Sequence, residues 1–394
     1  MVTFLPFPGY RPALKNDERI EYRISPPYDV IGKEYLKILQ DHRDNVTNLT
    51  LRQDVDRRYN GARKELDRMI SDGSLKQDTD SFYLYEQIFN DHGTMKTRVG
   101  IVGVLKVEDY EEGNVIPHEE TFSKVKEDRL NLLRDVEAHL ESIFGIFQGF
   151  TPDLNRKIHD AAKLVYRYMD AQGVDHRYNR IDDADIIAQI VEQLKTQKML
   201  IADGHHRYET ALAYSKENPG DEKKEYVLTT MVAVADEGLV IWPTHRLVSS
   251  DTVKEADAVK AIREKMTVKE VTVEEMEAGL GDWMMGLRFK SGKCLLAKYE
   301  KGTDLCRLDT YVVQELILKE IYGYDGGISK VEYDAEYTSV KNSMDEGKYD
   351  LAIVLNDPSL KKVWELSMDG KRMPKKTTFF FPKIWSGFAL YLMR

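Results

Sequence analysis

The fold is indicated most clearly by residues 198–214, which read KMLIADGHHRYETALAY. The apolar run 198–202 predicts a short strand, and the apolar spacing over 206–214 predicts a helix. Gly204 allows a tight turn between the two. The first N–H groups of a helix have no partner within it, and together with the helix dipole they favour an anion. The predicted anion-binding turn consists of Asp203, Gly204, His205, His206 and Arg207.

Two groups of this turn have a specific expected role. Arg207 can form paired hydrogen bonds to phosphate oxygens, and Asp203 can hold Mg²⁺ or a substrate ammonium group. The alternative is that Asp203 only caps the helix and that the two histidines are surface residues. Because two adjacent histidines and an arginine in the first turn bring no packing benefit, we favour the functional interpretation.

Outward from this turn, the pattern predicts further strands and helices. Residues 81–89 and 97–107 are aromatic and β-branched runs that flank Asn90-Asp91-His92-Gly93, which is typical of a β-hairpin. Residues 226–235 and 239–242 predict a second hairpin. Residues 143–150 predict a strand after a polar insertion at 109–134. Helical spacing is expected at 34–75 with an irregular middle, at 153–169 and at 183–194.

The remaining chain divides into an opening segment and a second unit. Residues 1–31 contain five prolines and predict an irregular, extended wrapping segment. In the second unit we expect helices at 252–265 and 308–321, and strands at 283–289, 293–298 and 351–355. The fold class is therefore mixed α/β (α+β), with a first domain of residues 1–248 joined by 370–394 and a second α/β domain of residues 249–369.

Composition limits the partners and the compartment. The 394 residues include 57 Lys and Arg against 67 Asp and Glu, a net charge of −10, so nucleic acid is not an expected partner. No apolar stretch is long enough to cross a membrane and the N-terminus does not resemble a signal peptide, so a cytoplasmic location is expected. Cys294 and Cys306 are too few for a disulfide framework and predict ordinary buried thiols.

Three other polar segments carry groups suited to chemistry. Residues 117–129 place His118 beside Glu119, a pairing that suits proton abstraction, and supply cations that could neutralise phosphate. Residues 374–378 and 243–246 combine hydroxyl groups with cations near prolines. Taken alone, 117–129 and 374–378 are more typical of a solvated surface than of a site, and 243–246 is equally typical of a structural ion pair. The candidates from these segments are His118, Glu119, Thr121, Lys126, Arg129, His245, Arg246, Lys375, Lys376, Thr377 and Thr378.

Taken together, these motifs resemble the bacterial and archaeal family catalogued as domain of unknown function 1015, over nearly the full chain. The motifs that carry the resemblance are Pro26-Pro27-Tyr28-Asp29-Val30, Pro117-His118-Glu119, Asp128-Arg129, Asp203 to Tyr208, Pro243-Thr244-His245-Arg246 and Met373 to Thr378. This resemblance adds Asp29 to the candidate residues. It names a family and no reaction.

A second resemblance is to the archaeal free L-serine kinase, an enzyme with a ParB/sulfiredoxin-like core. Its Pro-His-Glu, Asp-Gly-His-His-Arg and Pro-Lys-Thr-Thr segments occur here in the same order, the last with one additional lysine. The resemblance implies that Glu119 accepts the proton of a small-molecule hydroxyl, with His118 and Asp203 also catalytic. It further implies that Gly204 to Arg207, Lys126, Arg129 and Lys375 to Thr378 bind the phosphoryl donor.

The expected function is therefore a cytoplasmic small-molecule kinase that converts free L-serine to O-phosphoserine. The donor is left open among ATP, ADP and pyrophosphate, since no Walker-type loop is present, and Mg²⁺ is expected near Asp203. The alternative is a non-catalytic nucleotide or metabolite sensor of the ParB-like superfamily. Sulfiredoxin chemistry is not favoured, because His205 stands where those enzymes have a cysteine.

Overall fold

The computed structural model describes residues 1–15, 18–51, 59–119, 123–300, 308–324, 329–374 and 376–394. The chain divides into two compact units, which are treated separately below. Unit 1 consists of 1–117, 121–240 and 382–394, and unit 2 consists of 118–120 and 241–381. The chain thus passes between the units after residues 117, 120, 240 and 381. The domain boundaries expected from the sequence stay a prediction; the compact division places 241–248 and 370–381 in unit 2.

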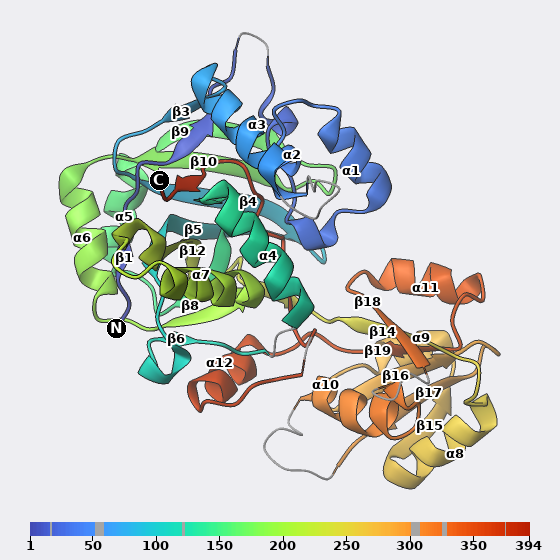
Figure 1. The fold of residues 1–394 in the computed structure, drawn as a ribbon. Coiled ribbons are helices and arrows are strands. Elements are labelled where there is room, and N and C mark those ends of the chain that lie inside the picture. Colours follow the sequence, from blue (N-terminus) through green and yellow to red (C-terminus); the bar gives the residue numbers. More distant parts are fainter. Residues whose placement is uncertain (16–17, 52–58, 120–122, 301–307, 325–328, 375) are drawn as a thin grey trace. The chain divides into compact units, whose positions relative to one another are not determined.

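Unit 1 is built from strands, α-helices and short 3₁₀ helices (Figure 1). Its strands are β1 (Phe4–Leu5), β2 (Tyr10–Pro12), β3 (Leu75–Gln77), β4 (Phe82–Asp91), β5 (Thr94–Lys106), β6 (Val115–Ile116), β7 (Ala138–His139), β8 (Ile143–Phe147), β9 (Lys163–Met169), β10 (Asp175–Ile181), β11 (Met199–Asp203), β12 (Tyr226–Ala233) and β21 (Tyr391–Leu392). Its helices are η1 (Ile20–Tyr22), η2 (Tyr28–Val30), α1 (Lys33–Gln40), α2 (Thr47–Thr50), α3 (Asn60–Ser71), η3 (Tyr110–Glu112), α4 (Ser123–Val136), α5 (Pro152–Ala161), α6 (Ala184–Leu194), α7 (His205–Glu217) and η4 (Glu222–Glu225).

The main sheet of unit 1 is mixed. Its strand order is β6-β11-β8-β12-β5-β4-β10-β9, and β1 pairs with β5 at the side of this path. The pairs β6–β11 and β8–β12 are parallel, whereas β4–β5, β5–β12, β8–β11, β4–β10 and β9–β10 are antiparallel. Helix α7 packs on β8 and β12, and α4 packs on α7. The candidate turn therefore lies at the end of β11, beside the most buried strands of the sheet.

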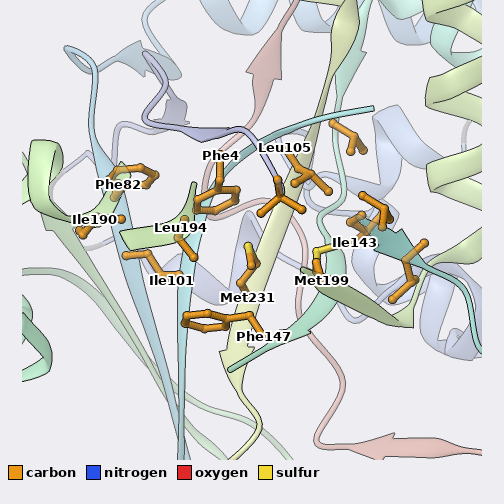
Figure 2. Close-up of a cluster of buried hydrophobic side chains, with 14 of the residues drawn as sticks. Phe4, Phe82, Ile101, Leu105, Ile143, Phe147, Ile190, Leu194, Met199 and Met231 are labelled. Carbon is orange, nitrogen blue, oxygen red and sulfur yellow. The ribbon is translucent and has the colours of Figure 1, made fainter. Parts of the chain in front are cut away.

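The core of unit 1 is formed by apolar side chains that the strands present to the helices. Figure 2 shows Phe4, Phe82, Phe147, Met199 and Met231 in this cluster, and all are buried. Strand β8 is buried along its whole length, as expected for a strand in the interior of a sheet. This packing gives the strands next to the turn fixed positions.

Unit 2 contains a second sheet, of order β15-β17-β16-β19-β14-β18, whose strand pairs are all antiparallel, and a small sheet of β13 and β20. Its strands are β13 (Val240–Trp242), β14 (His245–Ser250), β15 (Thr267–Val271), β16 (Met284–Phe289), β17 (Cys294–Lys298), β18 (Ser329–Asp334), β19 (Leu351–Val354) and β20 (Phe379–Phe381). Its helices are α8 (Glu255–Lys265), α9 (Val273–Ala278), α10 (Asp309–Val312), the π-helix η6 (Val313–Lys319), α11 (Tyr337–Asp345) and α12 (Leu360–Met368).

Helices cover both faces of the larger sheet in unit 2. Successive side chains of a strand point to opposite faces, and in β14 Val248 packs with α8, α10 and η6 whereas Leu247 packs with α11. In β19, Ile353 and Ala352 are divided between the same two clusters. The sheet is consequently buried on both sides, which explains the continuous apolar sequence of β19.

Several expectations from the sequence are confirmed, including the mixed α/β class. The hairpin of β4 and β5 is antiparallel and pairs Asn90 with Met95. The strand-turn-helix at 199–217 is present, as are α6, the two strands expected at 283–298, and β19. The described residues of 1–31 contain only short strands and 3₁₀ helices as regular structure. Cys294 is a buried free thiol, and Cys306 lies outside the described residues.

Two expectations are wrong. The helix expected at 153–169 ends at Ala161, and 163–169 is strand β9, because its alternating side chains pair with β10. The hairpin expected at 226–242 does not form, because β12 lies in the main sheet of unit 1 and β13 pairs with β20. The polar stretch 109–134, expected only as an insertion, contains the helix α4.

Across the described residues, no helix combines the length and apolar character needed to cross a bilayer.

Candidate functional site

The turn at Gly204 has the conformation that its sequence predicts. Strand β11 ends at Asp203, Gly204 is the N-cap residue with φ of 90°, and α7 begins at His205. A Cβ on Gly204 would lie 3.0 Å from Ile143 Cγ2 and 3.1 Å from Arg207 Nη2, so the positive φ favours glycine and a side chain there would be crowded. Asp203 is not the cap, and His205 is buried, which contradicts the surface interpretation of this residue.

Asp203 lies between cations. The Lys383 ammonium donates to Asp203 Oδ2 at 2.7 Å, and Arg207 Nη2 lies 3.9 Å from Asp203 Oδ1. The fully buried Arg98 is close enough for Asp203 to raise its pKa, although burial lowers that pKa to about 10. In this arrangement the charge of Asp203 is neutralised by side chains of the protein itself.

The expected Mg²⁺ site does not fit this geometry. Mg²⁺ prefers carboxylate oxygens that are free to coordinate it, whereas both oxygens of Asp203 face a cation. In the part of the chain that the structure describes, no three His, Cys, Asp or Glu side chains are grouped to hold a metal ion. We therefore derive no step through a metal.

A second feature of unit 1 is a buried group that we call the arginine cluster, formed by Tyr28, Arg129, Glu141 and Arg207. The Tyr28 N–H donates to Glu141 Oε1 at 3.1 Å, and the Arg129 guanidinium lies over the Tyr28 ring, 4.6 Å from its centroid. Burial raises the pKa of Glu141, while Arg207 and Arg129 act in the opposite direction. Burial also opposes the charge of Arg207, yet Glu141 and Asp203 raise its pKa. The cluster therefore joins two permanent cations to one buried carboxyl group.

The arginine cluster borders a cavity of about 40 Å³ in unit 1. Arg129, Glu141 and Arg207 line it together with His139 and Thr210. Burial lowers the pKa of His139 to about 4, and its Nε2 has no hydrogen-bond partner among the described residues. Leu132, Leu133, Ala138 and Leu140 complete its lining, so the cavity has an apolar side and a polar side.

In unit 2, the Glu119 carboxylate is held by residues 376–378, which we call the threonine loop. Oε1 accepts hydrogen bonds from Thr377 N, Thr378 N and Thr378 Oγ1, each at 3.1 Å. Oε2 accepts one from Lys376 N at 3.3 Å. Lys376 has φ of 60°, and this left-handed residue turns three successive N–H groups toward the same carboxylate. A loop of this kind is an anion-binding concavity.

His118 is a buried residue that contacts the threonine loop. Its Nε2 lies 2.8 Å from Thr378 Oγ1, and its side chain is 1% exposed. Because the Thr378 hydroxyl hydrogen is directed to Glu119, the hydroxyl oxygen accepts from His118 Nε2–H. His118 thus orients Thr378.

Arg246 and His245 lie in the same unit, at the start of β14. The buried Arg246 guanidinium donates to Lys376 O at 3.1 Å and to Thr244 O, and its Nε has no partner among the described residues. Burial lowers its pKa to about 10, while Tyr333 and Glu119 raise it. His245 Nδ1 accepts from Leu355 N at 3.2 Å, and burial lowers the pKa of His245 to about 4. His245 is therefore a neutral structural residue in this geometry.

The candidate motifs thus separate by unit. Those at 28–29, 128–129 and 203–207 lie in unit 1, and those at 118–119, 244–246 and 376–378 lie in unit 2. That Asp203 and Arg207 act together with Glu119 stays a prediction. Lys126 is paired with Glu209 at 2.8 Å, and Asp29 is exposed. Thr121 and Lys375 lie outside the described residues.

Sequence reasoning missed Glu141, Lys383 and Arg98. Glu141 is the single carboxylate within residues 138–147, which otherwise are apolar or small apart from His139, and this isolation was the available signal. Arg98 similarly lies within β5, directly before its apolar residues 99–105. Lys383 gave no local signal, since its partner Asp203 is 180 residues away.

The fold places the chain among mixed α/β proteins, and comparison of its sequence with protein-family models identifies its family. The chain belongs to the family described as "Protein of unknown function (DUF1015)", whose model matches residues 4–311. No protein of curated function is significantly similar to it in sequence.

Solved structures with some similarity include a conserved hypothetical protein from Pyrococcus furiosus, with 15% identity and a TM-score of 0.41 over 71% of this chain and 93% of that one. A free serine kinase in complex with AMP has 15% identity and a TM-score of 0.41, over 68% and 83%. SbnI from Staphylococcus aureus, with a C-terminal truncation, has 12% identity and a TM-score of 0.41, over 74% and 87%. The ParB/sulfiredoxin-like core stays a prediction.

Proposed function

We propose that this chain is a phosphotransferase that moves a phosphoryl group from a small phosphorylated donor to the hydroxyl of a small molecule. The observation that carries the proposal is the contact of Glu119 with the threonine loop. It places a carboxylate and a set of oxyanion-binding donors in the same site. Phosphoryl transfer needs a proton acceptor and preorganised donors for phosphate oxygens, and it needs no covalent nucleophile.

In the proposed step, a lone pair of the acceptor hydroxyl forms the new O–P bond. The bond between phosphorus and the leaving oxygen breaks, and the leaving phosphate takes that electron pair. The Glu119 carboxylate receives the hydroxyl proton. The Thr378 hydroxyl and the N–H groups of 376–378 stabilise phosphate oxygens. His118 acts as a positioning residue for Thr378.

Unit 1 has candidate phosphate-binding groups of its own, which the proposal assigns to the donor. Arg207 is 12% exposed and its charge is maintained by Glu141 and Asp203, so it can form charge-assisted bonds to a donor phosphate. The N-terminus of α7 adds N–H groups to the same turn. The donor is proposed as ATP, ADP or pyrophosphate. The acceptor is proposed as free L-serine on the ordered motifs 117–119, 203–207 and 374–378.

A non-catalytic sensor is the second candidate, and one observation favours it. The Glu119 carboxylate accepts four hydrogen bonds from the described residues 376–378. A carboxylate with that many donors is a weak base. A protein that only binds a phosphorylated metabolite would have no need for a basic carboxylate at this position.

The test is turnover by the full chain. The purified protein is incubated with ATP, ADP or pyrophosphate and a panel of free amino acids, and phosphorus NMR is used to detect a new phosphomonoester. We expect O-phosphoserine with at least one donor. If calorimetry detects donor binding but no pair of donor and acceptor yields a phosphomonoester, the kinase proposal is rejected in favour of the sensor.

A further inference from the structure

The contact between Glu119 and the threonine loop has the geometry of an anion in its binding site. The four donors comprise three backbone N–H groups and one hydroxyl, at 3.1–3.3 Å from the carboxylate oxygens. The Glu119 side chain is only 16% exposed, so the contact is largely shielded from water. The same donors suit the oxygens of a phosphate group.

Arg246 gives a second, independent indication of an anion site. Its guanidinium is buried, and the partners of its Nη groups are the uncharged carbonyl oxygens of Thr244 and Lys376. Its Nε has no hydrogen-bond partner among the described residues. A buried cation normally has an anionic partner, and among the described carboxylates none forms an ion pair with Arg246 within 4.0 Å. The site therefore holds a buried positive charge next to the threonine loop, and Tyr333 and Glu119 stabilise that charge without a direct ion pair.

The occupied loop also bears on the basicity of Glu119. Hydrogen bonds to the charged form of a carboxylate favour that form and reduce its tendency to take a proton. Glu119 can therefore accept a hydroxyl proton effectively only after it has lost some of these bonds. An incoming anion that takes over the same donors would remove them.

We propose that the threonine loop, with Arg246, is a binding site for a phosphate group, and that Glu119 occupies it in the free protein as an internal competitor. A phosphate that enters the loop displaces the carboxylate. The displaced Glu119 loses its hydrogen-bond donors and becomes the stronger base that the chemistry needs. This last step rests on the proposed function, whereas the competition for the loop does not.

The competition predicts that one mutation in the site strengthens anion binding instead of weakening it. Glu119→Ala removes the competing carboxylate, so the full-length variant should bind inorganic pyrophosphate about tenfold more tightly than the wild type. This factor corresponds to about one charge-assisted contact, which pyrophosphate no longer has to displace. Glu119→Gln should fall between the two, because its amide oxygen still accepts hydrogen bonds without a charge. Isothermal titration calorimetry measures all three affinities.

Two further variants locate the effect. Glu365→Ala removes an exposed carboxylate of α12 in the same unit and changes the net charge equally, so it should leave pyrophosphate affinity unchanged. Thr378→Val keeps the side-chain size and removes one donor, so it should reduce the gained affinity when combined with Glu119→Ala. Thermal unfolding confirms that each variant is folded.

The proposal is overturned if Glu119→Ala binds pyrophosphate as weakly as the wild type, or if Glu365→Ala reproduces the gain, or if Thr378→Val leaves the gain intact. These outcomes are separate from failure of the proposed function. If Glu119→Ala binds pyrophosphate more tightly but the wild type shows no turnover, the competing role of Glu119 is retained and the kinase function is rejected. Turnover that depends on Glu119, without a gain in affinity, would do the reverse.

Discussion

The backbone N–H of Tyr28 donates a hydrogen bond to Glu141 Oε1 at 3.1 Å. This bond ties the opening segment of the chain to a carboxyl group 113 residues later, inside the arginine cluster. Glu141 was not a candidate from the sequence, yet it is the residue that connects Tyr28 with Arg129 and Arg207. The first prediction therefore concerns this carboxyl group.

Glu141→Gln should change how stability depends on pH. Burial raises the pKa of Glu141 above its ordinary value of 4.5, so the folded protein binds this proton more tightly than the unfolded chain. The contribution of Glu141 to stability is complete below pH 4.5 and is lost as the pH rises through the raised pKa. The variant, measured against the wild type by urea unfolding, should therefore become relatively more stable from pH 4.5 toward pH 7. If the difference in unfolding free energy between the variant and the wild type did not change with pH, the pKa of Glu141 would not be raised in the folded protein.

His245→Asn should reduce acid sensitivity. Burial lowers the pKa of His245 from 6.5 to about 4, so the neutral form is favoured by roughly 3 kcal/mol, and that stability is lost as the pH falls from 6.5 through 4. Asparagine keeps an acceptor for the Leu355 N–H and does not titrate. The urea midpoint of the variant should fall less than that of the wild type between pH 7 and pH 4.5. The matched control is His92→Asn, at a side chain that is 69% exposed, and it should follow the wild type.

Gly204→Ala should destabilise more than a matched glycine replacement. Both Gly204 and Gly73 have positive φ, but a Cβ at Gly73 meets no atom within 4 Å. Gly73→Ala therefore measures the backbone strain alone, about 1–2 kcal/mol. Gly204→Ala adds contacts with Ile143 and Arg207, and its unfolding free energy should fall further. Equal losses would mean that the turn relaxes to admit the Cβ.

Glu119→Gln and Arg207→Ala should fail in different ways. Loss of the proton acceptor should lower turnover about a hundred- to ten-thousandfold without weakening donor binding. Loss of the Arg207 guanidinium should weaken donor binding by roughly 1.5–3 kcal/mol. Calorimetric titration beside a turnover assay separates the two effects. Full turnover by Glu119→Gln with serine and every other accepted hydroxyl compound would disprove the catalytic role of Glu119.

Local patterns predicted much of the fold, and their failures have clear causes. The β4–β5 hairpin and the turn at Gly204 depend on neighbouring residues, so both could be predicted. The mixture of charged and apolar residues from Lys163 to Met169 fits the end of a helix as well as a strand. Pairing with β10, which is not visible in the local sequence, makes this segment the strand β9. Strand β13 has its partner in β20, more than a hundred residues away, which no local pattern reveals.

The candidate site was predicted in part for the same reason. His118, Glu119 and the threonine loop form one contact set, although 257 residues separate Glu119 from Lys376. Their motifs could be named from the sequence, but the hydrogen bonds that hold the carboxylate could not. Lys383 and Glu141 belong to no motif, because their roles depend on burial beside charged partners.

The division of the chain between the units also sets an order for biosynthesis. Every segment of unit 2 precedes residue 382, whereas unit 1 requires 382–394. These last residues supply Lys383 to Asp203 and strand β21 to β7. A ribosome therefore finishes all of unit 2 before it has made the final strand of unit 1, even though unit 1 was begun first. Unit 1 can be completed only after residues 382–394 have left the ribosome, and premature termination near residue 381 would remove the lysine that pairs with Asp203.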